Sequence, residues 1–384
     1  MTEQAKVPAI RFAGFTDPWE QRQLGELVTT TIGGGTPSTS NPAYWDGEIP
    51  WIQSSNVLED TLFDVDIPKA ITQKGLEESA AQIVPENSIA VVTHVGVGKL
   101  IYLPFQYSTS QDFISLCGLK GDARYTCYAL WKRLQEDLHI VQGSAIKGIT
   151  KEDLLEKNLP MPSVEEQAQI GVLFSQLDNL ITLHQRKYDK LVILKKSMLE
   201  KMFPKDGESV PEIRFAGFTD PWEQRKFSEI VDVCSGRDYK HLDEGPIPVY
   251  GTGGYMTSVS EALSHNRDAI GIGRKGTIDK PYLLKAPFWT VDTLFYAIPK
   301  SDINLEFALC SFLNVDWKSK DESTGLPSLS KESINETVLS VPNVVEQNHL
   351  GNFFADLDRL ITLHQRKLEL LQNIKKSLLD KMFV

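Results

Sequence analysis

The sequence has few cysteines, no long apolar run and little positive charge. Its 384 residues include four cysteines, none of them in a C-x-x-C pair, which argues against a disulfide framework and suits a reducing compartment. No apolar run reaches the roughly 18 residues of a membrane-spanning helix, and the N-terminal MTEQAKVPAIRF lacks the apolar core of a signal peptide. We therefore expect a cytoplasmic protein with no membrane partner.

Acidic residues outnumber basic ones. The formal net charge is -11, from 40 Lys and Arg against 51 Asp and Glu. A protein that coats nucleic acid through bulk charge has the opposite balance. Local contacts to nucleic acid remain open, because they need only a few well-placed donors.

Motifs for catalysis are missing as well. The chain has no G-x-x-x-x-G-K-S/T loop, no H-E-x-x-H, no G-x-S-x-G, no N-P-P-Y/F motif, and no metal-ligand spacing among its seven histidines. One G-x-G-x-x-G match occurs at Gly271 to Gly276, but TIDKPYLLKAP follows it, without the helical period that a dinucleotide fingerprint needs. We expect no catalytic residue, no metal and no cofactor bound by this chain.

What the chain does have is two long repeats. IRFAGFTDPWEQR occurs at residues 10–22 and again at 213–225, and LDNLITLHQRKYDKLVILKKSMLEKMF at 177–203 returns as LDRLITLHQRKLELLQNIKKSLLDKMF at 357–383. Each unit therefore has an opening segment, a variable middle and a repeated tail. PKDGESVP, residues 204–211, has the composition of a linker between the units.

Both tails predict long helices. Ser163 with Glu166 and Asn343 with Glu346 form capping patterns at the two starts. A continuous helix over 165–203 would be roughly 58 Å long, too long to bury its apolar stripe on a small domain, so each helix should pair with the other. The expected heptad seam comprises Leu173, Leu177, Leu180, His184, Leu191, Leu194, Met198, Phe353, Leu357, Leu360, His364, Leu371, Ile374 and Leu378.

Polar residues interrupt this seam at the same place in both copies. His184 and His364 lie near the helix midpoints, so antiparallel pairing about a pseudo-two-fold axis should bring them face to face or onto one partner surface; the alternative is two solvated histidines. Lys195, Lys196, Lys375 and Lys376 are interpreted as a solvated helix face.

The variable middles predict mixed α/β structure. Apolar runs at 88–92, 268–273 and 293–298 are bounded by turn residues and suit strands. The two middles align by eye as 49–56 with 247–254 and as 88–96 with 268–276, which places His94 opposite Arg274 and Asp112 opposite Asp292. Most of the extra length of the first middle then lies between Asn56 and Ser88.

The paired W-E-x-R segments, the helix starts P-x-x-x-E-Q-x-x-I/L-G at 162–171 and 342–351, the LITLHQRK helices and the KMF ends resemble the specificity subunit of type I restriction-modification enzymes. The resemblance covers essentially the whole chain. It implies that each middle is a target recognition domain reading one half of a split sequence in double-stranded DNA. It also implies two modification subunits that methylate adenine and restriction subunits that cleave, with S-adenosylmethionine, ATP and Mg²⁺ on those partners.

The fold class expected is mixed α/β, with two mainly β recognition domains separated by two long helices that pair as an antiparallel coiled coil. The expected boundaries are 1–162 for the first recognition domain, 163–203 for the central spacer helix, 204–211 for the linker, 212–342 for the second recognition domain, and 343–384 for the C-terminal spacer helix.

Candidate DNA contacts are sought in loops, where contact residues concentrate. Residues 267–285 hold five Lys or Arg against two Asp, and Arg274 is the first choice for a guanine or phosphate contact. The other candidates of the second middle are Arg237, Tyr239, Lys240, Thr252, Gly253, Tyr255, Lys275 and Thr277. Those of the first are Trp45, Gln53, Ser54, Ser55, Asn56, Thr93, His94, Gly96 and Lys99.

One stretch opposes this interpretation. Residues 46–66 contain six acidic side chains and no Lys or Arg, so most of these carboxylates should face away from DNA. Two other hypotheses remain open: a self-contained nuclease or methyltransferase whose catalytic residues are not visible, and a coiled-coil scaffold that has lost DNA binding.

Overall fold

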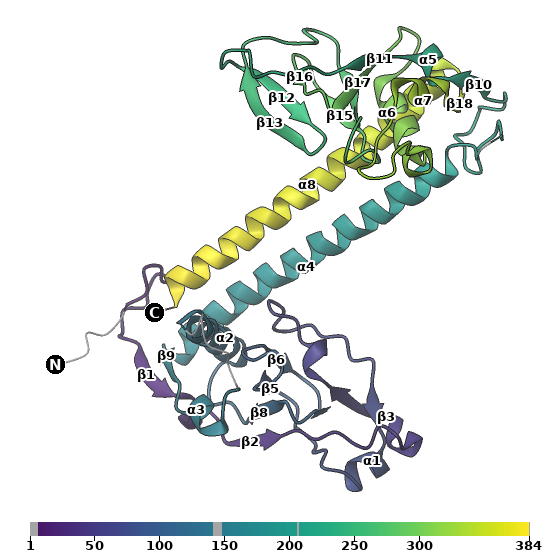
Figure 1. Ribbon diagram of the computed structural model, residues 1–384. Helices are drawn as coiled ribbons and strands as arrows, with labels where there is room; N and C mark the ends of the chain where they lie inside the picture. Colours follow the sequence, from purple (N-terminus) through teal and green to yellow (C-terminus); the bar gives the residue numbers. More distant parts are fainter. Residues whose placement is uncertain (1–6, 141–147, 206, 384) are drawn as a thin grey trace. The chain divides into compact units, whose positions relative to one another are not determined.

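The computed structural model describes residues 7–140, 148–205 and 207–383, which form two compact units (Figure 1). One unit comprises the chain up to Leu183 together with the chain from Leu368, and the other comprises His184–Lys367. Each unit therefore joins one mixed α/β domain to part of both long helices, and each is described by itself below.

The first domain has a four-stranded antiparallel sheet of order β2-β8-β5-β6 beside a three-stranded sheet of order β4-β3-β7. Their bounds are β2 Thr30–Gly33, β8 Phe113–Cys117, β5 Ser88–Val92, β6 Leu100–Leu103, β4 Ala70–Ile71, β3 Trp45–Ile52 and β7 Ser108–Thr109. β1 (Glu20–Gln23) pairs with β9 (Asn158–Met161), and the helices are α1 Gln73–Glu77, α2 Ala123–Ile140 and α3 Lys151–Leu155, with short 3-10 turns at Leu24–Glu26, Pro42–Tyr44 and Ser54–Asn56. All five residues of β5 are buried, which explains why this apolar run predicts its strand correctly.

The second domain repeats this topology. Its sheets have the orders β11-β17-β14-β15 and β13-β12-β16, and β10 pairs with β18. The strands are β10 Glu223–Lys226, β11 Val231–Ser235, β12 Ile247–Gly251, β13 Gly254–Val259, β14 Ala269–Gly273, β15 Tyr282–Leu284, β16 Trp289–Thr290, β17 Leu294–Pro299 and β18 Val338–Val341. The helices are α5 Phe227–Ile230, α6 Leu305–Asn314 and α7 Lys331–Glu336, with a 3-10 turn at Trp317–Lys320.

Strand pairing shows which residues of the two domains correspond. Ile52 pairs with Thr109 as Tyr250 pairs with Thr290, so the expected alignment of 49–56 with 247–254 is correct. The other alignment is wrong by one residue. Thr93 N donates to Asp112 O as Arg274 N donates to Thr293 O, so Thr93 is the counterpart of Arg274, and Asp112 that of Thr293. Loops of unequal length hid this shift.

The long helices are α4 (Val164–Lys201) and α8 (Val344–Met382). Ser163 Oγ accepts from Glu166 N at 3.3 Å and Asn343 Oδ1 accepts from Glu346 N at 3.0 Å, so both helices begin at the expected caps. Within each unit the end of one helix pairs antiparallel with the start of the other. In the first unit Phe383 stacks on Tyr125, and in the second Phe203 stacks on Phe307, which explains the repeated KMF ends.

The glutamates of the two capping patterns bind the opening segments. Arg11 donates through Nε and Nη2 to the two carboxylate oxygens of Glu166 at 2.7 and 2.8 Å, and Arg214 makes the same paired contact with Glu346 at the same distances. Both carboxylates are fully buried. The thirteen-residue repeat therefore supplies an identical clamp at the start of each long helix.

The glycine and glutamine of the repeated helix starts have matching roles. Gln347 Oε1 accepts from Asn304 N at 3.0 Å, as Gln167 Oε1 accepts from Asp122 N at 3.1 Å. A Cβ on Gly351 would lie 2.3 Å from Asn304 Oδ1. The backbone of each long helix therefore approaches the N-terminus of a domain helix too closely for any larger residue.

Two reciprocal ion pairs fix the antiparallel register. Lys195 Nζ lies 2.6 Å from Asp358 in the second unit, and Lys375 Nζ lies 2.6 Å from Asp178 in the first. The interpretation of these lysines as a solvated face is therefore wrong for Lys195 and Lys375, while Lys196 and Lys376 are exposed. A helical wheel cannot reveal a partner that another helix supplies.

Burial along the helices differs in part from the expected seam. Leu177 and Leu357 are buried, but so are Phe174 and Phe354, which the heptad pattern omits. Leu180, Leu194, Leu360 and Ile374 keep 38–43% of their surface exposed. Two helices alone do not cover this apolar surface, because a pair of helices shields only the stripe between them.

Candidate nucleic-acid interface

Three segments of the second domain meet beyond the ends of its strands. Ser235, the last residue of β11, lines a cleft of about 380 Å³ together with Arg274 and Lys275, which follow β14. The Thr252 hydroxyl, just after β12, lies 3.9 Å from the position that a Cβ on Gly276 would take. The fold thus gathers two of the turns that the sequence analysis selected separately.

Arg274 is held in an outward-facing position. Its Nη1 donates to Asp292 O at 3.3 Å, and its guanidinium carbon lies 5.8 Å from the centre of the Phe295 ring. The residue is exposed. Because one carbonyl and one ring face orient the planar guanidinium, its other donors are available for a paired contact with a guanine edge or a phosphate.

A loop that the sequence analysis missed, residues 321–330, lies against Arg274. Gly276 N donates to Pro327 O at 2.8 Å, and Leu329 N donates to Arg274 O at 3.0 Å. Asp321 closes the loop by accepting from Ser323 N and Ser328 N, both at 2.9 Å, and these bonds lower its pKa. The turn residues of STGLPS were the available signal, but nothing local connects them to a turn some fifty positions earlier.

The remaining candidates of the second domain differ in accessibility. Arg237, Lys240 and Tyr255 are exposed, and Tyr255 keeps 64% of its surface. Tyr239 packs instead against the apolar cluster around Val249. The candidates that lie on the turns without being fully exposed are Thr252 and Thr277, while Gly253 is exposed but offers only its backbone.

In the first domain all the candidates except Trp45 fall in two turns. Gln53 to Asn56 form a turn closed by Gln53 N donating to Asn56 Oδ1 and by Gln53 Nε2 donating to Ser55 Oγ; Ser54 lies within it. His94, Gly96 and Lys99 lie between β5 and β6. Thr93 is buried and its hydroxyl donates to Asp112 O at 3.0 Å, so this side chain supports the turn.

Trp45 is engaged within its own domain. Its Nε1 donates to Ser38 O at 3.1 Å, its ring meets Trp51 edge-on at 5.1 Å, and the Lys69 ammonium lies 5.8 Å from both ring centres. The polar atom and much of the ring are therefore occupied, and Trp45 fits a structural part of the turn better than a reading residue.

The acidic stretch is exposed but anchored. All six of its carboxylates, from Asp46 to Asp66, are on exposed residues, while Leu62 is buried and Phe63 packs on Tyr128 of α2. Trp131 Nε1 also donates to Glu59 O at 3.0 Å. The part that holds Leu62 and Phe63 therefore lies against α2.

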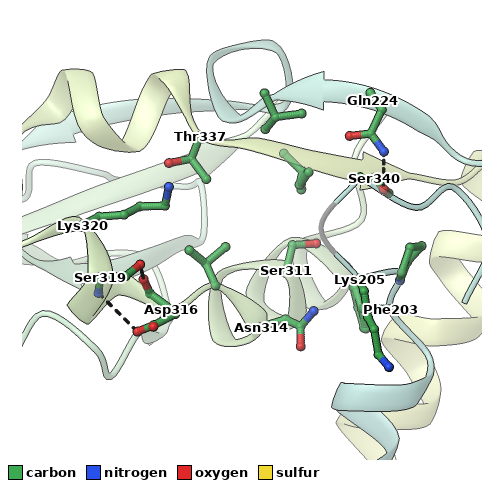
Figure 2. Close-up of a pocket in the computed structure, with 15 residues that line it drawn as sticks. Phe203, Lys205, Gln224, Ser311, Asn314, Asp316, Ser319, Lys320, Thr337 and Ser340 are labelled. Carbon is green, nitrogen blue, oxygen red and sulfur yellow. Dashed lines mark hydrogen bonds between the residues drawn. The ribbon is translucent and has the colours of Figure 1, made fainter.

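A second cavity is lined in part by the linker. It measures about 540 Å³, and Figure 2 shows Gln224 donating to Ser340 on its wall. Gln224 Nε2 and Ser340 Oγ both donate to Glu208 O, at 3.1 and 2.9 Å, so its polar groups tie down the segment after Phe203. The segment that has the composition of a linker is in this way hydrogen-bonded to the second domain.

Other kinds of site find no support among the described residues. No group of three His, Cys, Asp or Glu side chains there could hold a metal ion. None of the helices described is long and apolar enough to cross a lipid bilayer. β14 is followed by a turn and β15, so the G-x-G-x-x-G match opens no helix.

Two similar mixed α/β domains on paired antiparallel helices define a two-domain recognition protein without a visible catalytic centre among the described residues. The family described as type I restriction modification DNA specificity domain matches residues 16–192 and 219–373, and the chain belongs to this family. It is a specificity subunit, not a catalytic one.

Relatives and a solved structure agree with this family. The MjaVIII specificity subunit of Methanocaldococcus jannaschii is 23% identical over 95% of this chain and 92% of its own length. The MjaIX specificity subunit of the same organism is 28% identical over 57% of this chain, and that match spans only 52% of the relative. The fold is similar to that of a type I S subunit from M. genitalium, with a TM-score of 0.71, 18% identity and 99% of both chains covered.

Proposed function

We propose that each domain reads one half of a bipartite target in double-stranded DNA and that the paired helices set the distance between the halves. The observation that carries this proposal is the repeated clamp, in which Arg11 with Glu166 and Arg214 with Glu346 attach two domains of one topology to equivalent helix starts. Two readers on a rigid spacer suit half-sites about one helical turn apart, on the order of 10 base pairs.

The proposal assigns residues 1–162 and 212–342 to the two recognition domains, 163–203 and 343–384 to the spacer helices and 204–211 to the linker. The reading residues are the exposed ones on the turns, with Arg274, Lys275, Arg237, Lys240 and Tyr255 in the second domain and His94 and Ser55 in the first. Gln53, Ser54 and Asn56, which are partly buried, complete the turn that carries Ser55. Their target sequence depends on docking geometry, not on side-chain type alone.

The spacer helices are also the proposed docking surface for two modification subunits. The exposed apolar side chains of each unit support this assignment, namely Leu180 and Leu370 in the first and Ile193 and Leu363 in the second. Apolar surface on a helix face is typical of protein interfaces. S-adenosylmethionine, ATP and Mg²⁺ would then bind the modification and restriction subunits, which act on DNA in the cytoplasm.

Sequencing for N6-methyladenine tests this function. DNA from cells that express the chain with its modification subunit is compared with DNA from cells that lack the chain. We expect a methylated motif of two short words around a fixed gap. A folded, assembled partner with no new motif would contradict the recognition role and favour the scaffold hypothesis, and methylation or cleavage by the purified chain alone would favour an unseen catalytic site.

A further inference from the structure

We propose that the cleft beside Arg274 binds one backbone phosphate of DNA and so positions the second recognition domain on its half-site. The inference rests on the proposed function. The cleft has a volume of about 380 Å³ and is lined by the cations Arg274, Lys275 and Lys331 against one carboxylate, Glu322, with the hydroxyls of Ser235 and Ser328. The Ser330 hydroxyl also lines it, but its proton is donated to Glu322.

The charges in this cleft are available to a ligand. Over residues 7–140, 148–205 and 207–383, neither Lys275 nor Lys331 forms an ion pair, whereas Lys285 and Lys318 of the same domain pair with Asp268 and Asp279. The opposing Glu322 accepts from Ser330 Oγ at 2.8 Å, so the three cations face one carboxylate that already has a donor. A cleft with three cations against one carboxylate suits a phosphodiester.

The walls are held in place by backbone bonds. Lys275 N donates to Thr293 O at 3.3 Å, and Leu329 N to Arg274 O at 3.0 Å, so the turn after β14 and the loop 321–330 form one unit. Ser330 caps α7 by accepting from Ser333 N at 2.9 Å, which fixes the start of the helix that carries Lys331. A preformed site loses little freedom when it binds.

The corresponding positions of the first domain differ. The strand registers make Gly33 equivalent to Ser235, Thr93 to Arg274 and His94 to Lys275. Of the three cations, only Lys331 has a basic equivalent, Lys151. A buried threonine replaces the arginine. Among these described counterpart positions the cations are therefore fewer.

The test uses the chain assembled with its modification subunits and a duplex carrying the methylated motif. Equilibrium affinity is measured between about 50 and 200 mM salt for the unaltered complex, Lys275→Gln and Lys331→Gln. Each variant should weaken binding to target and non-target duplexes alike. Because one phosphate is bound, Lys275→Gln/Lys331→Gln together should make the slope of log affinity against log salt shallower by at most about 1, and each single variant by part of that. Lys320→Gln, on the Trp317–Lys320 turn and outside this cleft, is the matched control and should leave the slope unchanged.

A neutral methylphosphonate placed singly along the second half-site locates the contact. At one position it should weaken the unaltered complex, and it should weaken Lys275→Gln and Lys331→Gln by less, because each variant has already lost part of this contact. Unchanged slopes, or a loss that disappears when one base pair of the target is altered, would overturn the inference while the bipartite motif still stands. Stabilisation by millimolar inorganic phosphate that both variants abolish, without any change in DNA slope, would instead show a free-anion site and would also overturn it.

Discussion

His184 Nδ1 of α4 lies 2.8 Å from His364 Nδ1 of α8. One ring must donate and the other accept, so the contact exists with at least one neutral histidine. This is the face-to-face arrangement expected from the polar break in the helix pattern. Each histidine belongs to its helix's copy of the repeated LITLHQRK sequence.

Acid should loosen this contact. Burial first, then His364, Lys367 and Lys187, lower the pKa of His184; burial, Lys187 and Lys367 lower that of His364. The unfolded chain then binds more protons than the folded one, so the contribution is complete above the unfolded pKa of about 6.5 and is lost as pH falls through the folded values. We expect the thermal midpoint of the full chain to fall between pH 7 and pH 5.5 by more than that of His184→Asn/His364→Asn. Equal pH slopes for the two proteins would contradict this.

Removing the buried ion pair between Arg214 and Glu346 should cost much of the stability of the chain. Glu346 is 1% exposed and Arg214 is 11% exposed, so Glu346→Ala leaves a nearly buried guanidinium without its partner. We expect a loss of about 3 kcal/mol in denaturant unfolding. Glu212→Ala, which removes a mostly exposed pair with Lys201, is the control and should cost under about 1 kcal/mol. Similar losses for both would mean that the clamp contributes only as a surface pair.

Exchanging the charges of Lys195 and Asp358 should restore the stability that a single charge reversal loses. Lys195→Asp alone places two carboxylates together and should destabilise the full chain by about 1 kcal/mol, since Asp358 is partly exposed. Lys195→Asp/Asp358→Lys should recover most of that loss. Failure of the exchanged pair to recover any stability, measured by thermal unfolding, would argue against this antiparallel register.

The close approach at Gly351 predicts a steric cost. Gly351→Ala places a methyl group 2.3 Å from Asn304 Oδ1 and 3.2 Å from Glu306 Cβ, which should cost about 1 to 3 kcal/mol. Gly253→Ala, where a Cβ meets nothing within 4 Å, is the matched control and should change unfolding little. A neutral Gly351→Ala would show that the helix start can move.

Much of the fold could be predicted from local patterns. Strand Ser88–Val92 is an unbroken apolar run, and the caps at Ser163 and Asn343 mark where α4 and α8 begin, because these signals act between neighbours in sequence. The candidate site was predicted less well. Arg274 was found by its charge, but the loop 321–330 beside it was missed, and its counterpart in the first domain was placed one residue too far along.

The sequence by itself determined the two-unit plan, the helix ends and the family, since repeats and capping residues are visible in the letters alone. Only the tertiary structure decided that Lys195 meets Asp358, that Thr93 and not His94 stands for Arg274, and that Lys331 joins Lys275 in one cleft. The physical reason is that these relations depend on strand register and helix packing between distant segments, which no local pattern encodes.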